Sequence, residues 1–220
     1  MAERGWLIER VCASATELHA WEPPPAARIA RWSEVDAPAL VLGSAQSPTT
    51  IDLEACARLG IEVVRRRSGG GAVLTLPGEL VWLDVVVPAG DPLWDDDIGR
   101  SMWWFGDMWA AAFGACGIQA AEVHRGPLVR TPWSSTVCFE GLGPGEVVVG
   151  GRKAVGISQR RTRHWARLQA AVHLRWRPAL LTTLVGEALP EGTELRAPFC
   201  LAIDHVDAVR AEIERRLVER

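Results

Sequence analysis

The chain has 220 residues, of which 48% are hydrophobic and 23% are charged. These proportions are typical of a globular protein with one large domain or two small ones. The net charge of −3 excludes the strong basic field that a nonspecific nucleic-acid-binding protein needs.

The first residues lack a basic segment followed by an apolar one, and no apolar run approaches the roughly 20 residues of a membrane span. We therefore expect a cytoplasmic protein that binds neither nucleic acid nor a membrane. Its five cysteines are widely scattered without a C-x-x-C pair, and its five histidines lack ligand-like spacing. These patterns argue against a disulfide framework and predict no structural metal.

The first elements are marked by proline, glycine and hydrophobic periodicity. A short amphipathic helix is expected before the proline-rich segment 21–27, and a buried strand over 39–45. A helix over 50–59 should stop at Gly60 and lead into a strand over 61–66.

Two turns then follow closely along the chain. Ser68-Gly69-Gly70-Gly71, called the glycine turn below, precedes an apolar run over 72–76. Pro77-Gly78-Glu79 precedes a second run over 80–87. Together with the strand over 61–66, these segments predict a three-stranded meander.

The second half opens with a tryptophan-rich helix, predicted over 95–116 because three aspartates stand at its start and Gly117 follows its end. Gly150-Gly151, between the apolar runs 147–149 and 152–157, predicts a two-residue hairpin turn. Period-two alternation places Lys153, Val155 and Ile157 on one face of the return strand. A last helix is expected over 203–218.

Lys153 is the only lysine in the chain, while the other basic residues are all arginines. A lysine ammonium is a compact charge on a thin stem, which can enter a narrow pocket and contact a single oxygen. The glycine turn can present bare backbone amides at close range to an anion, with Arg65, Arg66 and Arg67 beside it. These residues are the first candidates for chemistry.

Three motifs occur in order: Gly43-Ser44-Ala45-Gln46 after a strand, then Arg65 to Val73 around the glycine turn, then Gly151 to Gln159 around Lys153. Together they resemble the lipoate-protein ligase and octanoyltransferase family, over roughly residues 38 to 175. The resemblance implies an α+β fold, with a mixed, largely antiparallel sheet flanked by helices, of the biotin and lipoate ligase type related to class II synthetases. It implies one catalytic domain over 1–220 without a C-terminal accessory domain.

The resemblance also assigns roles to residues. Lys153 falls on the family's active-site lysine. The substrate- and nucleotide-binding positions that it implies are Arg65, Arg66, Ser68, Gly69, Gly70, Gly71, Ala72, Gly78, Gly156, Ser158 and Gln159.

The activity implied first is that of an ATP-dependent lipoate- or octanoate-protein ligase, which uses ATP and Mg²⁺. Such an enzyme activates the acid as an acyl-adenylate and transfers it to a lysine of a lipoyl domain. The implied acceptors are the lipoyl domains of 2-oxoacid dehydrogenase complexes or the glycine cleavage H protein. Lys153 would bridge the acyl carbonyl and the α-phosphate, stabilising charge as it develops.

Four positions depart from the family pattern: Thr75-Leu76 replaces His-Asp, Gly78-Glu79 replaces Gly-Asn, Gly145-Glu146 replaces Asn-Asp, and Ala170-Ala171 replaces His-Gly. These departures put the handling of ATP and Mg²⁺ in question, while the expected lack of a C-terminal accessory domain leaves room for a small accessory subunit. They also motivate an alternative from another class, a catalytically inactive lipoate- or acyl-binding protein.

Within the family, Cys138-Phe139 offers an alternative chemistry. The pair lies just before the lysine hairpin, where cysteine-dependent octanoyltransferases carry their nucleophile. Such an enzyme takes the acyl group from an acyl carrier protein thioester and needs no ATP. Against this reading, the turn here is Gly-Gly-Gly and not the Gly-Gly-Arg of those transferases. Both readings stay open at the level of sequence.

Overall fold

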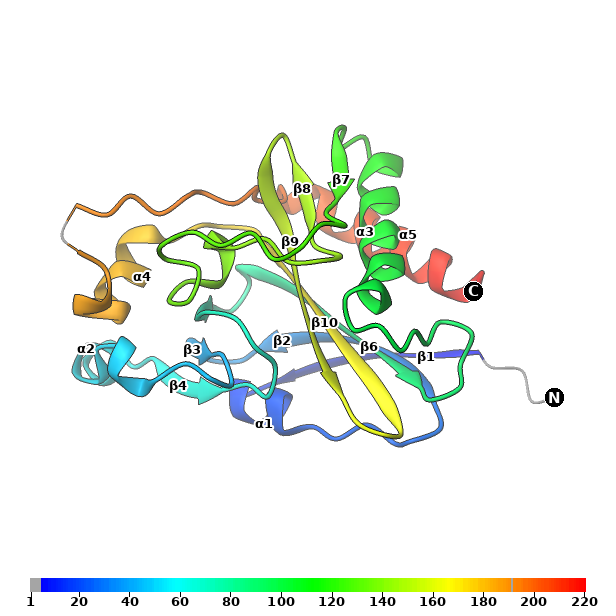
Figure 1. Ribbon diagram of the computed structural model, residues 1–220, viewed down its shortest axis with the longest axis horizontal. Helices are drawn as coiled ribbons and strands as arrows, with labels where there is room; N and C mark the ends of the chain where they lie inside the picture. The colour runs from blue at the N-terminus through cyan, green and yellow to red at the C-terminus, as the bar shows by residue number, and fades with distance from the viewer. Residues whose placement is uncertain (1–4, 191) are drawn as a thin grey trace.

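The computed structural model describes residues 5–190 and 192–220, and its main layer is a seven-stranded sheet (Figure 1). Every neighbouring pair in this sheet is antiparallel except β1 with β2. The predicted mixed, largely antiparallel sheet is therefore confirmed. In spatial order the strands are β1 (Trp6–Ala13), β2 (Arg28–Val35), β6 (Leu80–Pro88), β10 (Trp165–His173), β9 (Arg152–Arg161), β8 (Val147–Val149) and β7 (Ala121–Val123).

A smaller sheet has the order β4 (Glu62–Arg65), β3 (Ala39–Leu42) and β5 (Val73–Thr75). The predicted meander is therefore wrong, because β3 lies between β4 and β5, and β6 belongs to the larger sheet. Buried Arg66 explains the crossing: at the end of β4 its guanidinium donates to Val41 O on β3 and to Gly71 O. The glycine turn therefore carries the chain across the end of β3.

Helices cover both sheets. Figure 1 shows α3 (Trp103–Ala115) and α5 (Val206–Val218) along one side of the large sheet, with α2 (Leu53–Arg58) and α4 (Pro178–Val185) at the end that holds the small sheet. Helix α1 (Ala15–Ala20) connects β1 and β2. Single 3-10 turns are η1 (Pro48–Thr50), η2 (Arg100–Met102), η3 (Cys138–Glu140), η4 (Gly186–Ala188) and η5 (Ile203–His205). Within the described residues, no helix is long and apolar enough to span a membrane.

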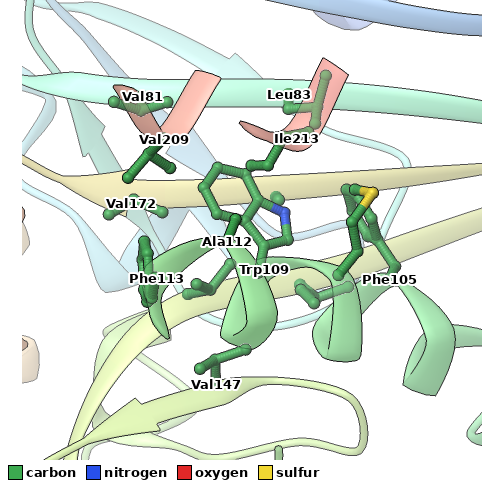
Figure 2. Packing of buried hydrophobic residues seen from close by; sticks show 14 of the residues in the cluster. Val81, Leu83, Phe105, Trp109, Ala112, Phe113, Val147, Val172, Val209 and Ile213 are labelled. Atoms are coloured by element: carbon green, nitrogen blue, oxygen red, sulfur yellow. The ribbon is translucent and has the colours of Figure 1, made fainter. Parts of the chain in front are cut away.

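The main core lies between α3, α5 and one face of the large sheet. Figure 2 shows Trp109 at its centre, packed among Phe113 of α3, Ile213 of α5 and Leu83 of β6. Because side chains alternate along a strand, Val81, Leu83 and Val85 of β6 enter this core and Trp82 points to the opposite face. That opposite face, turned toward the small sheet, carries the candidate site.

A local hydrogen bond corrects one other prediction. The tryptophan-rich helix begins at Trp103 and not near 95, because the Asp97 carboxylate accepts from Arg100 N and closes a turn first. The strand β1 was not predicted. The hairpin at Gly150-Gly151 is confirmed, with φ values of 57° and 74° at the two glycines.

Candidate active site

The glycine turn packs tightly onto the end of β3. A Cβ atom on Gly43 would lie 1.8 Å from the carbonyl oxygen of Gly70, so only glycine fits at this position. Ser44 N donates to Ser68 O at 2.9 Å beside this contact. The segment that begins at Gly43 therefore supports the glycine turn directly.

Two arginines support the backbone here, Arg65 at the 43–46 segment and Arg66 at the glycine turn. Arg65 Nη1 donates to three carbonyl oxygens of the 43–46 segment, at 2.6 to 3.2 Å. Arg66 donates to the carbonyls of Gly69 and Gly71 within the turn and to Val41. Burial lowers the pKa of the Arg66 guanidinium, while attraction to Cys138 and Glu146 opposes that shift. Both guanidinium groups therefore use N–H donors to hold the backbone of the site.

Cys138 lies directly beside the glycine turn. Ala72 N donates to Thr136 O at 2.8 Å, and Cys138 N donates to Ala72 O at 3.0 Å, so the two segments run together. A Cβ placed on Gly70 would lie 3.5 Å from Cys138 Sγ and 2.8 Å from Arg66 Nη2. The thiol and the guanidinium therefore border the same point above Gly70.

Lys153 reaches this region because β9 contains a bulge. Val148 pairs with Lys153 while Val147 pairs with Val155, which leaves Ala154 as an extra residue. The predicted shared face of Lys153, Val155 and Ile157 is therefore wrong, since the bulge turns Lys153 away from the main core. Its Cε lies 3.4 Å from the position of a Cβ on Gly156.

The Lys153 ammonium is surrounded by acceptors. Nζ donates to Cys138 O at 3.1 Å and to Gly141 O at 3.0 Å, and lies 2.8 Å from Glu146 Oε2. The Lys153 and Glu146 side chains are each 6% exposed. An ammonium has three N–H donors, so these three partners occupy all of them. The Phe139 ring centroid lies 5.0 Å from Nζ as well.

A mostly apolar cavity, called the central cavity below, opens between the two sheets next to Cys138. The small sheet contributes Val41 and Val73, the large sheet contributes Trp82 and Ala171, and Cys138 stands in the wall. His19 of α1 completes the wall and stacks on Trp82, with ring centroids 4.7 Å apart. Burial lowers the pKa of His19 to about 4, so the imidazole is neutral at pH 7. This cavity has the chemistry to hold a hydrocarbon chain.

The structure gathers most of the residues proposed from the sequence. Arg66, Cys138, Gly156 and Ser158 line the central cavity. The Ser68 hydroxyl donates to Ser158 Oγ at 3.0 Å, which joins the glycine turn to the lysine strand. Arg65, Gly69, Gly70, Gly71 and Ala72 lie in or beside that turn.

Two proposed residues lie elsewhere. Gln159 faces the other side of the sheet, where its Nε2 donates to Ser101 Oγ at 3.0 Å. Gly78 occupies the exposed turn between β5 and β6, with φ of 69°, and is not among the described residues that line the central cavity. The role of each in binding stays a prediction.

Sequence reasoning missed His19 and Trp82 as cavity residues and noted Glu146 only as a departure from a motif. His19 and Trp82 carry no local signal, because they meet only when α1 folds over β6. Glu146 does carry a local signal. It stands between glycines and the run Val147-Val148-Val149, at the start of an expected buried strand, where an unpaired charge is rare.

The donor set beside Lys153 does not fit a magnesium-bound nucleotide well. Glu146 Oε2 already accepts from Gly143 N and lies against Lys153, while Oε1 accepts from Ile157 N. In the part of the chain that the structure describes, no group of three or more His, Cys, Asp or Glu side chains is arranged to hold a metal ion.

The fold thus brings a thiol, a buried ammonium and an apolar cavity together at one site. Residues 12–198 match the family of the lipoyl protein ligase A/B catalytic domain, and the chain belongs to that family.

Relatives in sequence are octanoyltransferases. The chain is 29% identical over 111 residues to octanoyltransferase LipM of Clostridioides difficile, which covers 50% of this chain and 40% of that protein. It is 33% identical over 141 residues to LipM of Moorella thermoacetica, covering 63% and 49%. The chain therefore matches less than half the length of these curated relatives.

Solved structures share the fold. Protein Ta0514 of T. acidophilum with bound lipoic acid has a TM-score of 0.69 at 17% identity, over 99% of this chain and 85% of that one. Lipoate-protein ligase A bound with ATP has a TM-score of 0.64 at 19% identity, over 88% and 72%. The predicted lipoate-ligase type of fold is confirmed.

Proposed function

We propose that this protein is a cysteine-dependent acyltransferase of protein lipoylation, which passes an octanoyl-type chain from a thioester donor to a lysine of a lipoyl domain. One observation carries the proposal: Cys138 stands in the wall of the central cavity and its Sγ borders the point above Gly70 that Arg66 also borders. The names of the two curated relatives support the transfer of an octanoyl group.

The setting of Cys138 suits a nucleophile. The residue is half-buried, so a donor can reach the thiol, and a cation lies beside it. Arg66 is that cation, since its guanidinium is held in place by three backbone carbonyls. The apolar wall of the central cavity would hold the acyl chain while its carbonyl carbon faces the sulfur.

The reaction would proceed in two balanced steps. The Cys138 thiolate attacks the carbonyl carbon of the donor thioester, the new S–C bond forms, and the donor's thiolate leaves and takes up a proton. The neutral amine of the acceptor lysine then attacks the acyl-cysteine, an amide forms, and the Cys138 thiolate is released. The proton lost by the amine goes to solvent.

The motif predicts that the Lys153 ammonium contacts the acyl carbonyl, whereas in this structure it is bonded to three protein acceptors. To polarise an acyl carbonyl, its ammonium must exchange one of its three protein acceptors for that oxygen. In the transfer proposed here, Lys153 instead secures the segment that carries Cys138. Polarisation of the acyl group by Lys153 stays a prediction.

The rival functions within reach are ATP-dependent ligation and binding without catalysis. ATP is bound in one structure that shares the fold, and another solved structure is that of a bipartite lipoate protein ligase with its E2 lipoyl domain. An acceptor lipoyl domain is therefore a sound choice of substrate for a test of all three functions.

The test incubates the protein and a lipoyl domain with an octanoyl acyl carrier protein thioester, and separately with octanoate, ATP and Mg²⁺. Intact mass spectrometry follows both the enzyme and the acceptor. We expect adducts from the thioester, an acyl-enzyme on Cys138, and loss of both in Cys138→Ser. Cys200→Ser, which removes a thiol outside the central cavity, should behave as wild type.

Modification of the acceptor only with ATP, undiminished in Cys138→Ser, would overturn the proposal in favour of the ligase. Binding of octanoate without an adduct from either donor would identify an acyl-binding protein.

A further inference from the structure

The buried carboxylate of Glu146 is fully engaged. Its Oε2 accepts from Gly143 N at 2.7 Å and lies 2.8 Å from Lys153 Nζ, and its Oε1 accepts from Ile157 N at 3.0 Å. Glu146 lies just before β8. Where the pairing of β8 with β9 ends, its side chain accepts the hydrogen bond of a β9 backbone amide in place of a strand carbonyl. None of these contacts involves solvent.

The main core sets the position of Glu146. A Cβ on Gly106 of α3 would lie 2.1 Å from Gly145 O, and a Cβ on Gly145 would lie 2.6 Å from Met102 Cβ. The turn that precedes Glu146 is therefore pressed against α3 and η2, with no room for side chains at the contact. A rigid element thus holds the carboxylate at a fixed place.

Lys153 connects this carboxylate to the cysteine. Its two carbonyl acceptors belong to Cys138, the first residue of η3, and to Gly141, the C-cap of η3. The ammonium therefore clamps both ends of the short turn that carries the Cys138 thiol. A single 3-10 turn has few hydrogen bonds of its own to fix its position.

We propose that Glu146 is a positioning residue of the site, which holds the Lys153 ammonium and through it the turn that carries Cys138. A buried ammonium without a counter-charge is unstable, so it would leave its place. Its departure removes the clamp from η3. The link to catalysis rests on the proposed function of Cys138, while the clamp itself does not.

A purely structural role for Glu146 makes a different prediction. If its carboxylate only satisfied Gly143 N and Ile157 N, its loss would disturb those two amides and leave η3 unchanged. A double-mutant cycle separates the roles, because a residue that acts through Lys153 has no further effect once Lys153 is replaced.

The experiment measures hydrogen–deuterium exchange by mass spectrometry on the full chain, in peptides covering 138–142. Four amides there, those of Cys138, Glu140, Gly141 and Leu142, are bonded to backbone carbonyls and report local opening of the turn. The variants are Glu146→Gln, Lys153→Met and their combination, with exposed Glu122→Gln as the control. If Lys153→Met does not fold, Lys153→Arg takes its place, since its fork cannot reproduce the three contacts.

We expect each single variant to speed exchange in this peptide by about ten-fold or more, and the double variant to add nothing beyond the larger single effect. Glu146→Asp, which restores the charge on a shorter stem, should recover part of the protection and part of the acyl-transfer rate. Unchanged exchange in Glu146→Gln, or independent effects that multiply in the double variant, would overturn the proposal.

The exchange measurement needs no acyl donor, so it stands apart from the test of Cys138. Failure of Cys138→Ser to affect transfer would remove the proposed function and leave the clamp intact. Unchanged exchange in 138–142 would remove the clamp and leave the proposed function intact.

Discussion

Replacing Gly43 by alanine tests whether the glycine turn and the end of β3 form one rigid seat for the site. The new Cβ would stand 1.8 Å from Gly70 O, and real Cβ atoms keep at least 3.0 Å from such neighbours. Because both groups belong to the backbone, the glycine turn must move by about 1.2 Å to relieve the overlap.

Such a shift would break bonds that cross the same contact. Ser44 N to Ser68 O at 2.9 Å and Arg65 Nη1 to Gly43 O at 3.0 Å would both stretch toward or beyond hydrogen-bonding range. Their loss, with the strain of overpacking, should lower the free energy of unfolding by about 2 to 3 kcal/mol. A 1 Å displacement of a catalytic group typically costs about 100-fold in rate, and Gly70 borders the Cys138 thiol.

The assay combines urea unfolding with the rate of acyl transfer from an octanoyl thioester. Gly114→Ala is the matched control, because it lies in α3 with no heavy atom within 4 Å of the added Cβ. We expect that control to gain up to about 1 kcal/mol in stability and to keep its rate. Wild-type stability and rate in Gly43→Ala would refute the tight seat described here.

Two other predictions concern buried ionisable side chains. Lys153→Ala should lower the free energy of unfolding by about 3 to 5 kcal/mol, measured by urea unfolding, because the buried Glu146 carboxylate loses its cation; an unchanged midpoint would contradict the buried pair. Burial lowers the pKa of His19 and of His173 from 6.5 to about 4, with the charge of Lys153 adding to the shift at His173. Each imidazole binds a proton more readily in the unfolded chain, so its contribution to stability is complete above pH 6.5 and is lost as the pH falls toward 4. At pH 5 each histidine should have cost about 2 kcal/mol relative to pH 7, and His173→Gln should show about half of their joint pH dependence in urea unfolding; an equal pH dependence in that variant would show that His173 is not buried in the neutral form.

Local signals in the sequence predicted individual elements well. The two-residue turn at Gly150-Gly151 needs positive φ at both positions, and such a requirement is visible in the residue types alone. The last helix and the strand that leads from Gly60 were also predicted close to their observed bounds. In each case the deciding interactions lie within a few residues of one another.

Pairing between elements was predicted less well. The strands β4 and β5 look like neighbours in the sequence, yet β3 separates them because Arg66 joins the end of β4 to Val41 of β3. The bulge at Ala154 is likewise invisible in a strictly alternating pattern, and it decides which face Lys153 occupies. Register depends on contacts with a partner strand that the local pattern does not contain.

The amino-acid sequence alone pointed to the candidate residues of the site: one lysine, a run of glycines and a cysteine. Only the tertiary structure decided what these groups do to one another. The partners of the Lys153 ammonium include Glu146, whose preceding turn packs against α3. The wall of the central cavity depends on α1 folding over β6. Residue type sets the range of chemistry that a side chain can perform. Contacts between residues distant in the sequence set its burial and its partners, and these decide which chemistry it performs in the folded protein.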